Sequence, residues 1–281
     1  MSSLQHKIDF AVVLRVKHAN PNGDPLNGNR PRTDYNGYGE ITDVCIKRKL
    51  RDRLVENGYS IFVQSDDRKN DDAKNLRDRA EKALGSKFGS GETAKLASET
   101  WFDVRAFGQL FALPKKSKAK GQDEDGDTGV SIPIRGPVTI QSAFSLAPVD
   151  VTSTQITKSV SGDGDGTKRG SDTMGMKHRV DEAVYVFYGS MNPQLAERTG
   201  FSDADADAIK GILPKLFEND ASSARPEGSM AVLKLVWWKH KPGKIGQYSS
   251  AKVHGTLTAK PDGTYTLNNL EGLTPEVIEG F

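Results

Sequence analysis

The sequence predicts an α+β fold, in which an antiparallel sheet carries helices on one face. Two periodicities lead to this prediction. Apolar side chains between Ile8 and Val16 fall at every second position, which is the period of a strand with one buried face. Ile46, Leu50 and Leu54 instead recur every four positions, which is typical of a helix that buries one stripe. We therefore expect a single mixed domain, residues 1–281, with large insertions.

Composition narrows the possible classes of protein. The length of 281 residues allows one core with insertions or two small domains. The net charge is only +2, so a nucleic-acid site would need a local concentration of Lys and Arg. Cys45 is the single cysteine, which excludes an intrachain disulfide, and no Cys/His spacing suggests zinc. Without a signal peptide or about 18 consecutive apolar residues, we expect a cytoplasmic protein with no membrane partner.

The first half of the chain alternates elements with polar insertions. A loop rich in Asn, Gly and Pro follows the first strand, through residues 18–29. Thr42 is a suitable cap for a helix over residues 43–57. Residues 60–64 suggest a short strand, and a charged, helix-favouring stretch covers residues 66–84. It opens an inserted region, residues 66–129, whose polar end at residues 115–129 is expected to be a mobile loop.

The second half repeats the strand, helix, strand order. Strand character is expected at residues 136–146, 180–188 and 230–238, and a flexible stretch at residues 159–171. Ser202 and Asp205 predict a capping box for a helix that Pro214 should kink. A hairpin is expected at residues 252–267 around Asp262-Gly263, with the C-terminus adding an edge to the sheet. This order matches the split βαβ, or ferredoxin-like, pattern of RNA-recognition-motif domains, which hosts many functions.

The strongest local signal is the basic run from Lys47 to Arg53. Five cations and one acid give these seven residues a net charge of +4. At about 100° per residue, Lys47, Arg48 and Arg51 lie on one flank of the apolar stripe, where they could face phosphates. A solvated amphipathic helix would show the same pattern. The long Gly/Asn loop before the helix favours the phosphate interpretation, because its backbone N–H groups could converge on the same anion.

Several motifs then resemble one family. They are Asn20-Pro21-Asn22-Gly23-Asp24-Pro25, residues 28–32, 42–51, 101–105, 136–138 and 156–158, and Met174-Gly175-Met176-Lys177-His178. In order and spacing they resemble the backbone subunit of the type I-C CRISPR Cascade complex, within the RAMP superfamily. Leu26 and Met176 depart from the residues common at those positions.

This resemblance implies a modified RNA-recognition fold and a function in antiviral defence. Copies would stack helically along one CRISPR RNA, hold its phosphates, leave the bases free to pair with target DNA, and contact other Cascade subunits. It implies no catalysis and no cofactor. A β-hairpin thumb is expected at residues 153–179, where an apolar Met could wedge between bases. The implied RNA-binding residues are Asn20, Asn22, Arg30, Arg32, Thr42, Lys47, Arg48, Arg51, Thr157, Lys158, Met174, Lys177 and His178.

Other readings of the sequence remain open. A RAMP-type endoribonuclease that processes CRISPR RNA could use His18 and His178 as acid and base. An acidic ribonuclease could use Asp24, Asp34 or Asp43, and a protein scaffold would need no RNA. The alternating Asp residues at 123–127 and 163–165 do not complete a calcium loop. Trp237 and Trp238 should face opposite sides of a strand, with at least one in the core and base stacking as a secondary possibility.

Overall fold

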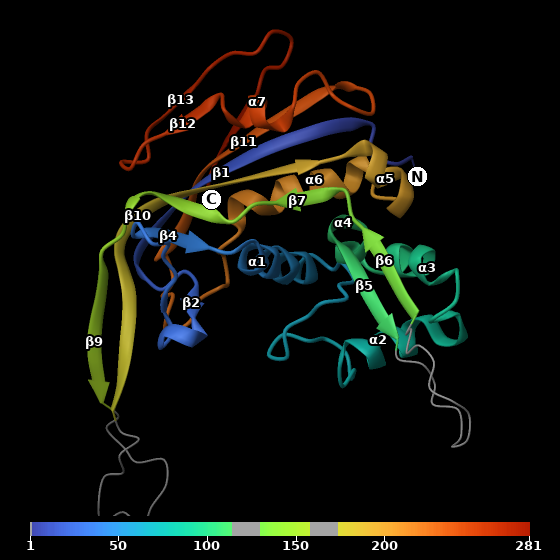
Figure 1. Cartoon of the computed structure of the whole chain (residues 1–281), viewed down its shortest axis with the longest axis horizontal. Helices are drawn as coiled ribbons and strands as arrows, with labels where there is room; N and C mark the ends of the chain where they lie inside the picture. Colours follow the sequence, from blue (N-terminus) through green and yellow to red (C-terminus); the bar gives the residue numbers. More distant parts are fainter. Residues whose placement is uncertain (1, 114–129, 158–173) are drawn as a thin grey trace, which may run out of the picture.

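The computed structural model describes residues 2–113, 130–157 and 174–281. Within these residues, eight strands form one antiparallel sheet with the order β14-β11-β1-β10-β8-β4, and β7 and β9 also pair with β10 (Figure 1). The strands are β1 (His6–Ala19), β4 (Tyr38–Ile41), β7 (Val138–Ile140), β8 (Ala143–Pro148), β9 (Val151–Thr157), β10 (Met174–Met191), β11 (Met230–Pro242) and β14 (Glu276–Glu279). The α+β class expected from the sequence is confirmed.

The centre of the sheet is the long strand β1, which pairs with β10 on one side and β11 on the other. The predicted period-2 strand is confirmed and extends beyond residues 8–16 at both ends. Phe10 packs directly over Gly189 of β10. A Cβ atom on Gly189 would lie 2.1 Å from Phe10 Cζ, so this position requires glycine.

Two helices cover one face of the sheet. They are α1 (Asp43–Glu56) and α6 (Asp203–Ile212), whose apolar stripes join the alternate residues of β1 in the main core. Thr42 caps α1 by accepting a hydrogen bond from the N–H of Cys45. The predicted capping box of Ser202 and Asp205 also forms. At Pro214 the chain tightens into a 3-10 turn, η4 (Leu213–Lys215), where the kink was expected.

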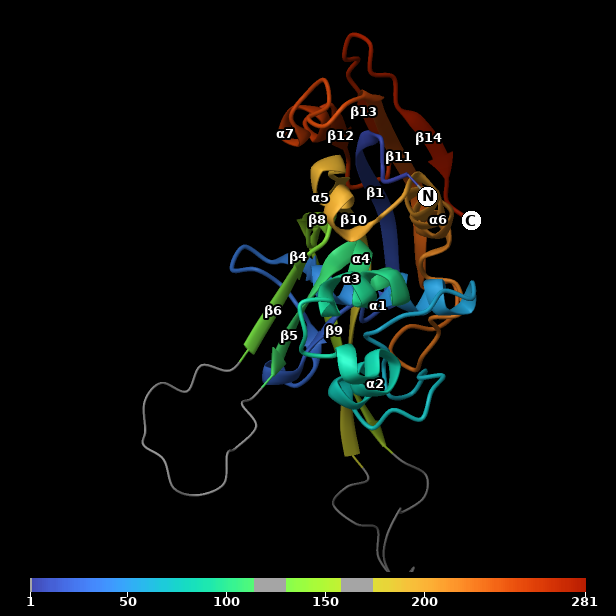
Figure 2. The same ribbon diagram turned by 90° about the vertical axis from the view of Figure 1, so that its right-hand side faces the viewer.

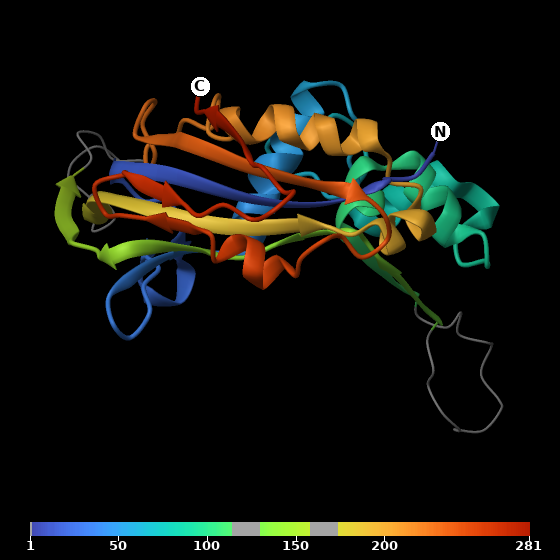
Figure 3. The same cartoon turned by 90° about the horizontal axis from the view of Figure 1, so that it is seen from above.

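The opposite face of the sheet is covered by the C-terminal segment (Figure 3). Helix α7 (Ser250–His254) and the hairpin β12 (Leu257–Ala259) and β13 (Tyr265–Leu267) pack there, around Trp238. The expectation of helices on one face only is therefore incomplete. The predicted hairpin at residues 252–267 is also shorter than expected, because its first residues belong to α7. The edge strand at the C-terminus is β14, which pairs with β11.

The inserted region has a small core of its own. It contains α2 (Leu76–Leu84), η2 (Gly85–Lys87), α3 (Thr93–Thr100), α4 (Phe102–Phe107), β5 (Gly108–Leu113) and β6 (Val130–Arg135), packed around Phe62, Trp101 and Phe111. The predicted strand at residues 60–64 is wrong, because Phe62 and Val63 donate their N–H groups to the carboxylate of Asp103 instead of to a strand. Helix over residues 66–84 forms only from Leu76 onward. The expected loops at 115–129 and 159–171 lie outside the described residues.

Two hairpins project from the helix-covered side of the sheet, one formed by β5 and β6 and the other by β9 and β10 (Figure 2). The loop after β1 forms a third, very short hairpin from β2 (Gly23–Asp24), η1 (Pro25–Asn27) and β3 (Arg30–Pro31). Among the described residues, no helix has the length and apolar character needed to cross a membrane.

Candidate nucleic-acid interface

The loop after β1 is attached to the start of α1 by its own predicted contact residues. Asn22 Oδ1 accepts hydrogen bonds from the N–H of Thr42 at 3.0 Å and from its hydroxyl at 2.9 Å. Asn20 is buried and donates its side-chain N–H to the carbonyl of Asn29 at 2.7 Å. These three side chains therefore fix the loop on the helix. The Asn-Pro-Asn-Gly-Asp-Pro motif that drew attention to Asn20 and Asn22 therefore has a structural role in holding this loop.

The β2–β3 turn is held in one conformation and presents two arginines. Gly23 allows the closest contact, since a Cβ there would lie 2.0 Å from Asn29 Oδ1. Arg30 lies opposite Asp24 in the register of the two strands, and the carboxylate of Asp24 lies 3.4 Å from Arg32 Nη2. The side chains of Arg30 and Arg32 thus project from a rigid turn.

The cations of α1 fall into two groups, and three of them serve the interior. Arg51 Nε lies 2.9 Å from Asp103 Oδ2, and its guanidinium stacks over Phe107. Lys49 is only 4% exposed and pairs with Asp220, while Arg53 pairs with Glu56 at 2.6 Å. Much of the +4 charge of this helix is therefore used within the fold.

Lys47 and Arg48 make up the accessible group on the predicted flank. Lys47 pairs with Asp43 one turn earlier, at 2.9 Å. The Arg48 side chain is 56% exposed and lies 3.4 Å from the carboxylate of Asp67 and 3.9 Å from that of Asp52. Ion pairs at such sites contribute about 0–1 kcal/mol, so both cations could exchange their carboxylates for phosphates at little cost.

The predicted thumb corresponds to the projecting strands β9 and β10. Their register pairs Met174 with Thr157 and Lys177 with Thr154. Met174 and Met176 lie on one face of this hairpin and are 61% and 55% exposed. Lys177 lies on the other face, on the same side as the exposed Ile156. Lys158 lies outside the described residues.

The base of the hairpin brings together two predicted contact residues. Arg30 donates from Nη1 to Ser153 Oγ at 2.9 Å. His178 Nδ1 lies 2.8 Å from the same oxygen. Sequence reasoning did not select Ser153. The expected hairpin bounds, residues 153–179, did not indicate it, because the pairing of Ser153 with His178 is seen only in the register of the structure.

The acidic and histidine alternatives find these side chains in other roles. Asp34 accepts two backbone N–H groups of its own turn, and Asp43 pairs with Lys47. In the described ranges, no hydrogen bond or ion pair joins His18 to His178, and no three His, Cys, Asp or Glu side chains gather as a metal site would require. Trp237 and Trp238 are both buried on opposite faces, as expected, so the base-stacking alternative is wrong.

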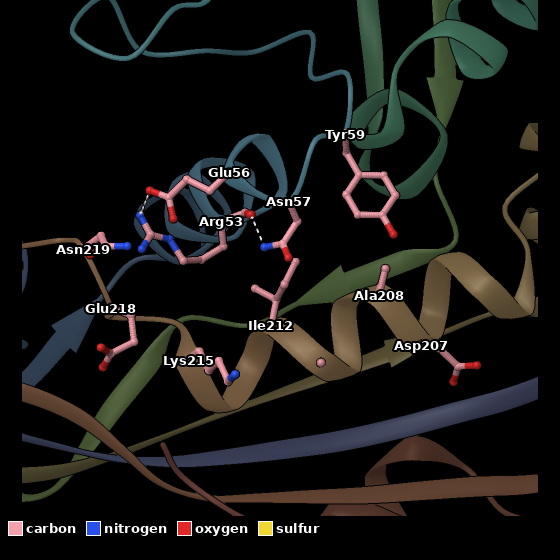
Figure 4. Close-up of a pocket in the computed structure, with 11 residues that line it drawn as sticks. Arg53, Glu56, Asn57, Tyr59, Asp207, Ala208, Ile212, Lys215, Glu218 and Asn219 are labelled. Atoms are coloured by element: carbon pink, nitrogen blue, oxygen red, sulfur yellow. Dashed lines mark hydrogen bonds and ion pairs between the residues drawn. The ribbon is translucent and has the colours of Figure 1, made fainter.

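A pocket of 360 Å³ lies between the C-terminal end of α1 and helix α6 (Figure 4). Its lining includes Arg53, Tyr59, Ile212 and Lys215. Arg53 is held there by Glu56, and the Asn57 side chain donates to the Arg53 carbonyl. None of the predicted contact residues lines this pocket, and a second pocket, of 270 Å³, has only Arg51 of them in its lining. The candidate interface is therefore the open surface formed by α1, the β2–β3 turn and the β9–β10 hairpin.

Together, the fold and this surface define an α+β protein with a projecting hairpin and accessible cations at its base and on α1. The family model described as CRISPR-associated protein Cas7 matches residues 6–274. The chain therefore belongs to the Cas7 family of CRISPR-associated proteins.

Individual relatives share only a low sequence identity with this chain. CRISPR-associated protein Cas7 of Haloferax volcanii is 25% identical over 292 residues, which cover 98% of this chain and 81% of the relative. One solved chain, described as a CRISPR RNA-guided surveillance complex, pre-nicking, has a TM-score of 0.46 at 15% identity and covers 85% of this chain and 80% of its own. A second, described as a CRISPR RNA-guided surveillance complex, has a TM-score of 0.42 at 14% identity, with 86% and 76% covered. Both TM-scores are below 0.5, and neither structure supports a functional conclusion.

Proposed function

We propose that this chain is a non-catalytic backbone subunit of a type I-C CRISPR Cascade complex. It holds the phosphates of a CRISPR RNA in the cytoplasm, and further copies bind beside it in a helical filament. The bases of the RNA then stay free to pair with target DNA, while other Cascade subunits complete the assembly. Such a division of labour, with protein on the backbone and base pairing for sequence, is how RNA-guided systems tolerate any guide.

The observation that carries the proposal is the exposed β9–β10 hairpin. A two-stranded hairpin alone is marginally stable in water, and this one displays Ile156, Met174 and Met176 to solvent. Exposed apolar side chains on a projecting element indicate a binding partner. Cations and polar side chains lie at the base of the same hairpin. Such a combination of apolar and cationic groups suits a partner that has both bases and phosphates.

The arrangement of the sheet supports an RNA-recognition-like palm whose usual binding face is partly covered. Strands and helices follow the order β1, α1, β8, β10, α6 and β11, with β11-β1-β10-β8 adjacent in the sheet. Part of the face away from α1 and α6 is buried beneath the C-terminal segment, around Trp238, while Phe144 on the same face stays 46% exposed. The accessible cations and the projecting hairpin lie elsewhere, so contact with RNA is assigned to α1, the β2–β3 turn and the hairpin. The type I-C assignment rests on the motifs at residues 20–25 and 42–51.

The test is size-exclusion chromatography of the purified chain at two wavelengths, with and without ribonuclease, followed by a denaturing gel. We expect protected RNA of discrete lengths within a large assembly. A nucleic-acid-free monomer that binds no added CRISPR RNA would contradict the proposal. A cleavage product that disappears with His18→Ala or His178→Ala would instead establish the endoribonuclease alternative.

A further inference from the structure

Two hydrogen-bonding side chains from separate elements converge on one oxygen at the base of the hairpin. Arg30 comes from the β2–β3 turn and His178 from β10, and both contact Ser153 Oγ of β9, at 2.9 and 2.8 Å. A hydroxyl has one hydrogen and two lone pairs, so it can accept from the guanidinium while it shares its second bond with the imidazole in either direction.

Both elements that carry these side chains are firmly anchored. The turn before Arg30 is fixed by the Asn20–Asn29 hydrogen bond and by the close approach at Gly23. His178 lies two residues from Val180, which is buried and pairs with Ala19 of the central strand. The three side chains therefore meet because the backbone places them there, and they form a preorganised cluster.

The charges around the cluster favour an anion. Among the described residues Arg30 has no ion-pair partner. Two carboxylates are near the cluster and both have other partners. Asp24, opposite Arg30 in the β2–β3 ladder, pairs with Arg32 and accepts the N–H of Leu26. Asp181 lies on the opposite face of the hairpin, where it accepts from Thr152 and pairs with Arg179. A planar guanidinium with an imidazole and a hydroxyl at its side is suited to a phosphate, whose oxygens each accept several hydrogen bonds.

We propose that Arg30, Ser153 and His178 form a subsite for one phosphodiester of bound RNA. The inference rests on the proposed function and deepens it, because it names one subsite and adds Ser153 to the binding residues. In the free protein, Ser153 Oγ occupies the acceptor position. On binding, a phosphate oxygen takes over the hydrogen bonds of Arg30 and His178, and the hydroxyl of Ser153 donates to the same group.

The test is anisotropy of a fluorescein-labelled oligouridylate with the full chain, over a series of KCl concentrations. We expect Arg30→Gln to weaken binding about tenfold. The slope of log affinity against log salt concentration should become shallower by about 0.7, which is the change for one lost phosphate contact on a single strand. Ser153→Ala should weaken binding about threefold, and Ser153→Thr, which keeps the hydroxyl on a strand-compatible residue, should restore it. Arg77→Gln removes an exposed cation on α2 and is the charge-matched control. Its affinity for RNA and its salt dependence should stay close to those of the wild type.

The outcomes separate this subsite from the wider proposal. If Arg30 and His178 contact one phosphate, Arg30→Gln with His178→Gln should lose less affinity than the product of the single losses. Independent effects, or Ser153→Ala with wild-type affinity, would overturn the subsite while RNA binding by the chain stands. Absence of RNA binding by the wild type would overturn both. Calorimetric titration of the wild type with inorganic phosphate alone should show no binding in the millimolar range. Tight binding of phosphate, together with an unchanged affinity of Arg30→Gln for RNA, would identify a free-phosphate site instead.

Discussion

Arg51 on α1 and Asp103 on α4 form an ion pair, 2.9 Å from Nε to Oδ2, that joins the main core to the inserted region. Asp103 also accepts the N–H groups of Phe62 and Val63, at 2.7 and 3.0 Å. One buried carboxylate thus organises the chain between α1 and α2. The family resemblance implies an RNA contact for Arg51, whereas its surroundings indicate a structural role, and the two can be separated by experiment.

We expect Arg51→Ala to lower the free energy of unfolding by about 3 kcal/mol, because it leaves the Asp103 carboxylate buried without its cation. Urea denaturation measures this loss. Arg77→Ala, which breaks an exposed pair with Glu81, is the matched control and should cost less than about 0.5 kcal/mol. Unchanged stability together with weaker RNA binding would show that Arg51 is a contact residue after all.

The double variant Lys47→Ala with Arg48→Ala should have the opposite profile. Its unfolding free energy should stay within about 1 kcal/mol of the wild type, since the pairs with Asp43 and Asp67 are at the surface and the contact of Arg48 with Asp52 is long, at 3.9 Å. Affinity for RNAs of unrelated sequence should fall equally, and the salt dependence should flatten by about 0.7 for each lost phosphate contact. Filter binding at several salt concentrations measures both. Unchanged affinity and slope would remove this flank of α1 from the interface.

The elements predicted correctly are those that local sequence determines. Strand β1 and helix α1 show long, regular periods, and the capping box of Ser202 and Asp205 uses neighbouring residues only. The predicted strand at residues 60–64 failed because its backbone bonds to Asp103, some 40 residues later. No local pattern reports a partner that far along the chain.

The candidate site divides in the same way. The helical period correctly placed Lys47 and Arg48 on an open flank, but it could not show that Arg51, on the same flank, has Asp103 as a partner. Ser153 was missed because its role depends on a turn more than 100 residues earlier. The cover over the second sheet face was missed for a similar reason, since α7 is too short to show a period.

The apolar face of the hairpin should matter for assembly and not for folding. We expect Met174→Ser with Met176→Ser to change the unfolding free energy by less than about 0.5 kcal/mol, because both side chains are exposed. If these side chains bind RNA or a neighbouring copy, sedimentation with CRISPR RNA should show smaller or irregular assemblies. Assemblies of wild-type size would restrict the hairpin's contribution to its base.

A buried polar cluster joins β1, β11 and the C-terminal cover. His240 Nε2 lies 2.8 Å from Asp9 Oδ2 and Lys7 Nζ lies 3.0 Å from it, while His254 Nε2 lies 3.6 Å from Oδ1. Burial opposes ionisation of Asp9, but hydrogen bonds from His240, Ser250 and Lys7 outweigh it and hold the pKa of this carboxyl below its ordinary value. Burial also lowers the pKa of His254, against the attraction of Asp9.

These shifts predict that acid weakens the folded state in two stages. Below the ordinary histidine pKa of 6.5, the unfolded chain protonates residue 254 while the folded chain resists, so stability falls as the pH drops toward the lowered pKa. The Asp9 contribution is complete above pH 3.8 and is lost as the pH falls further, through its lowered pKa. The free energy of unfolding, measured by urea denaturation between pH 7.5 and 5.0, should therefore decline by at most about 1.4 kcal/mol per pH unit for this one proton. His254→Gln should make that decline shallower. Equal slopes in the His254→Gln variant and the wild type would show that residue 254 titrates alike in both states.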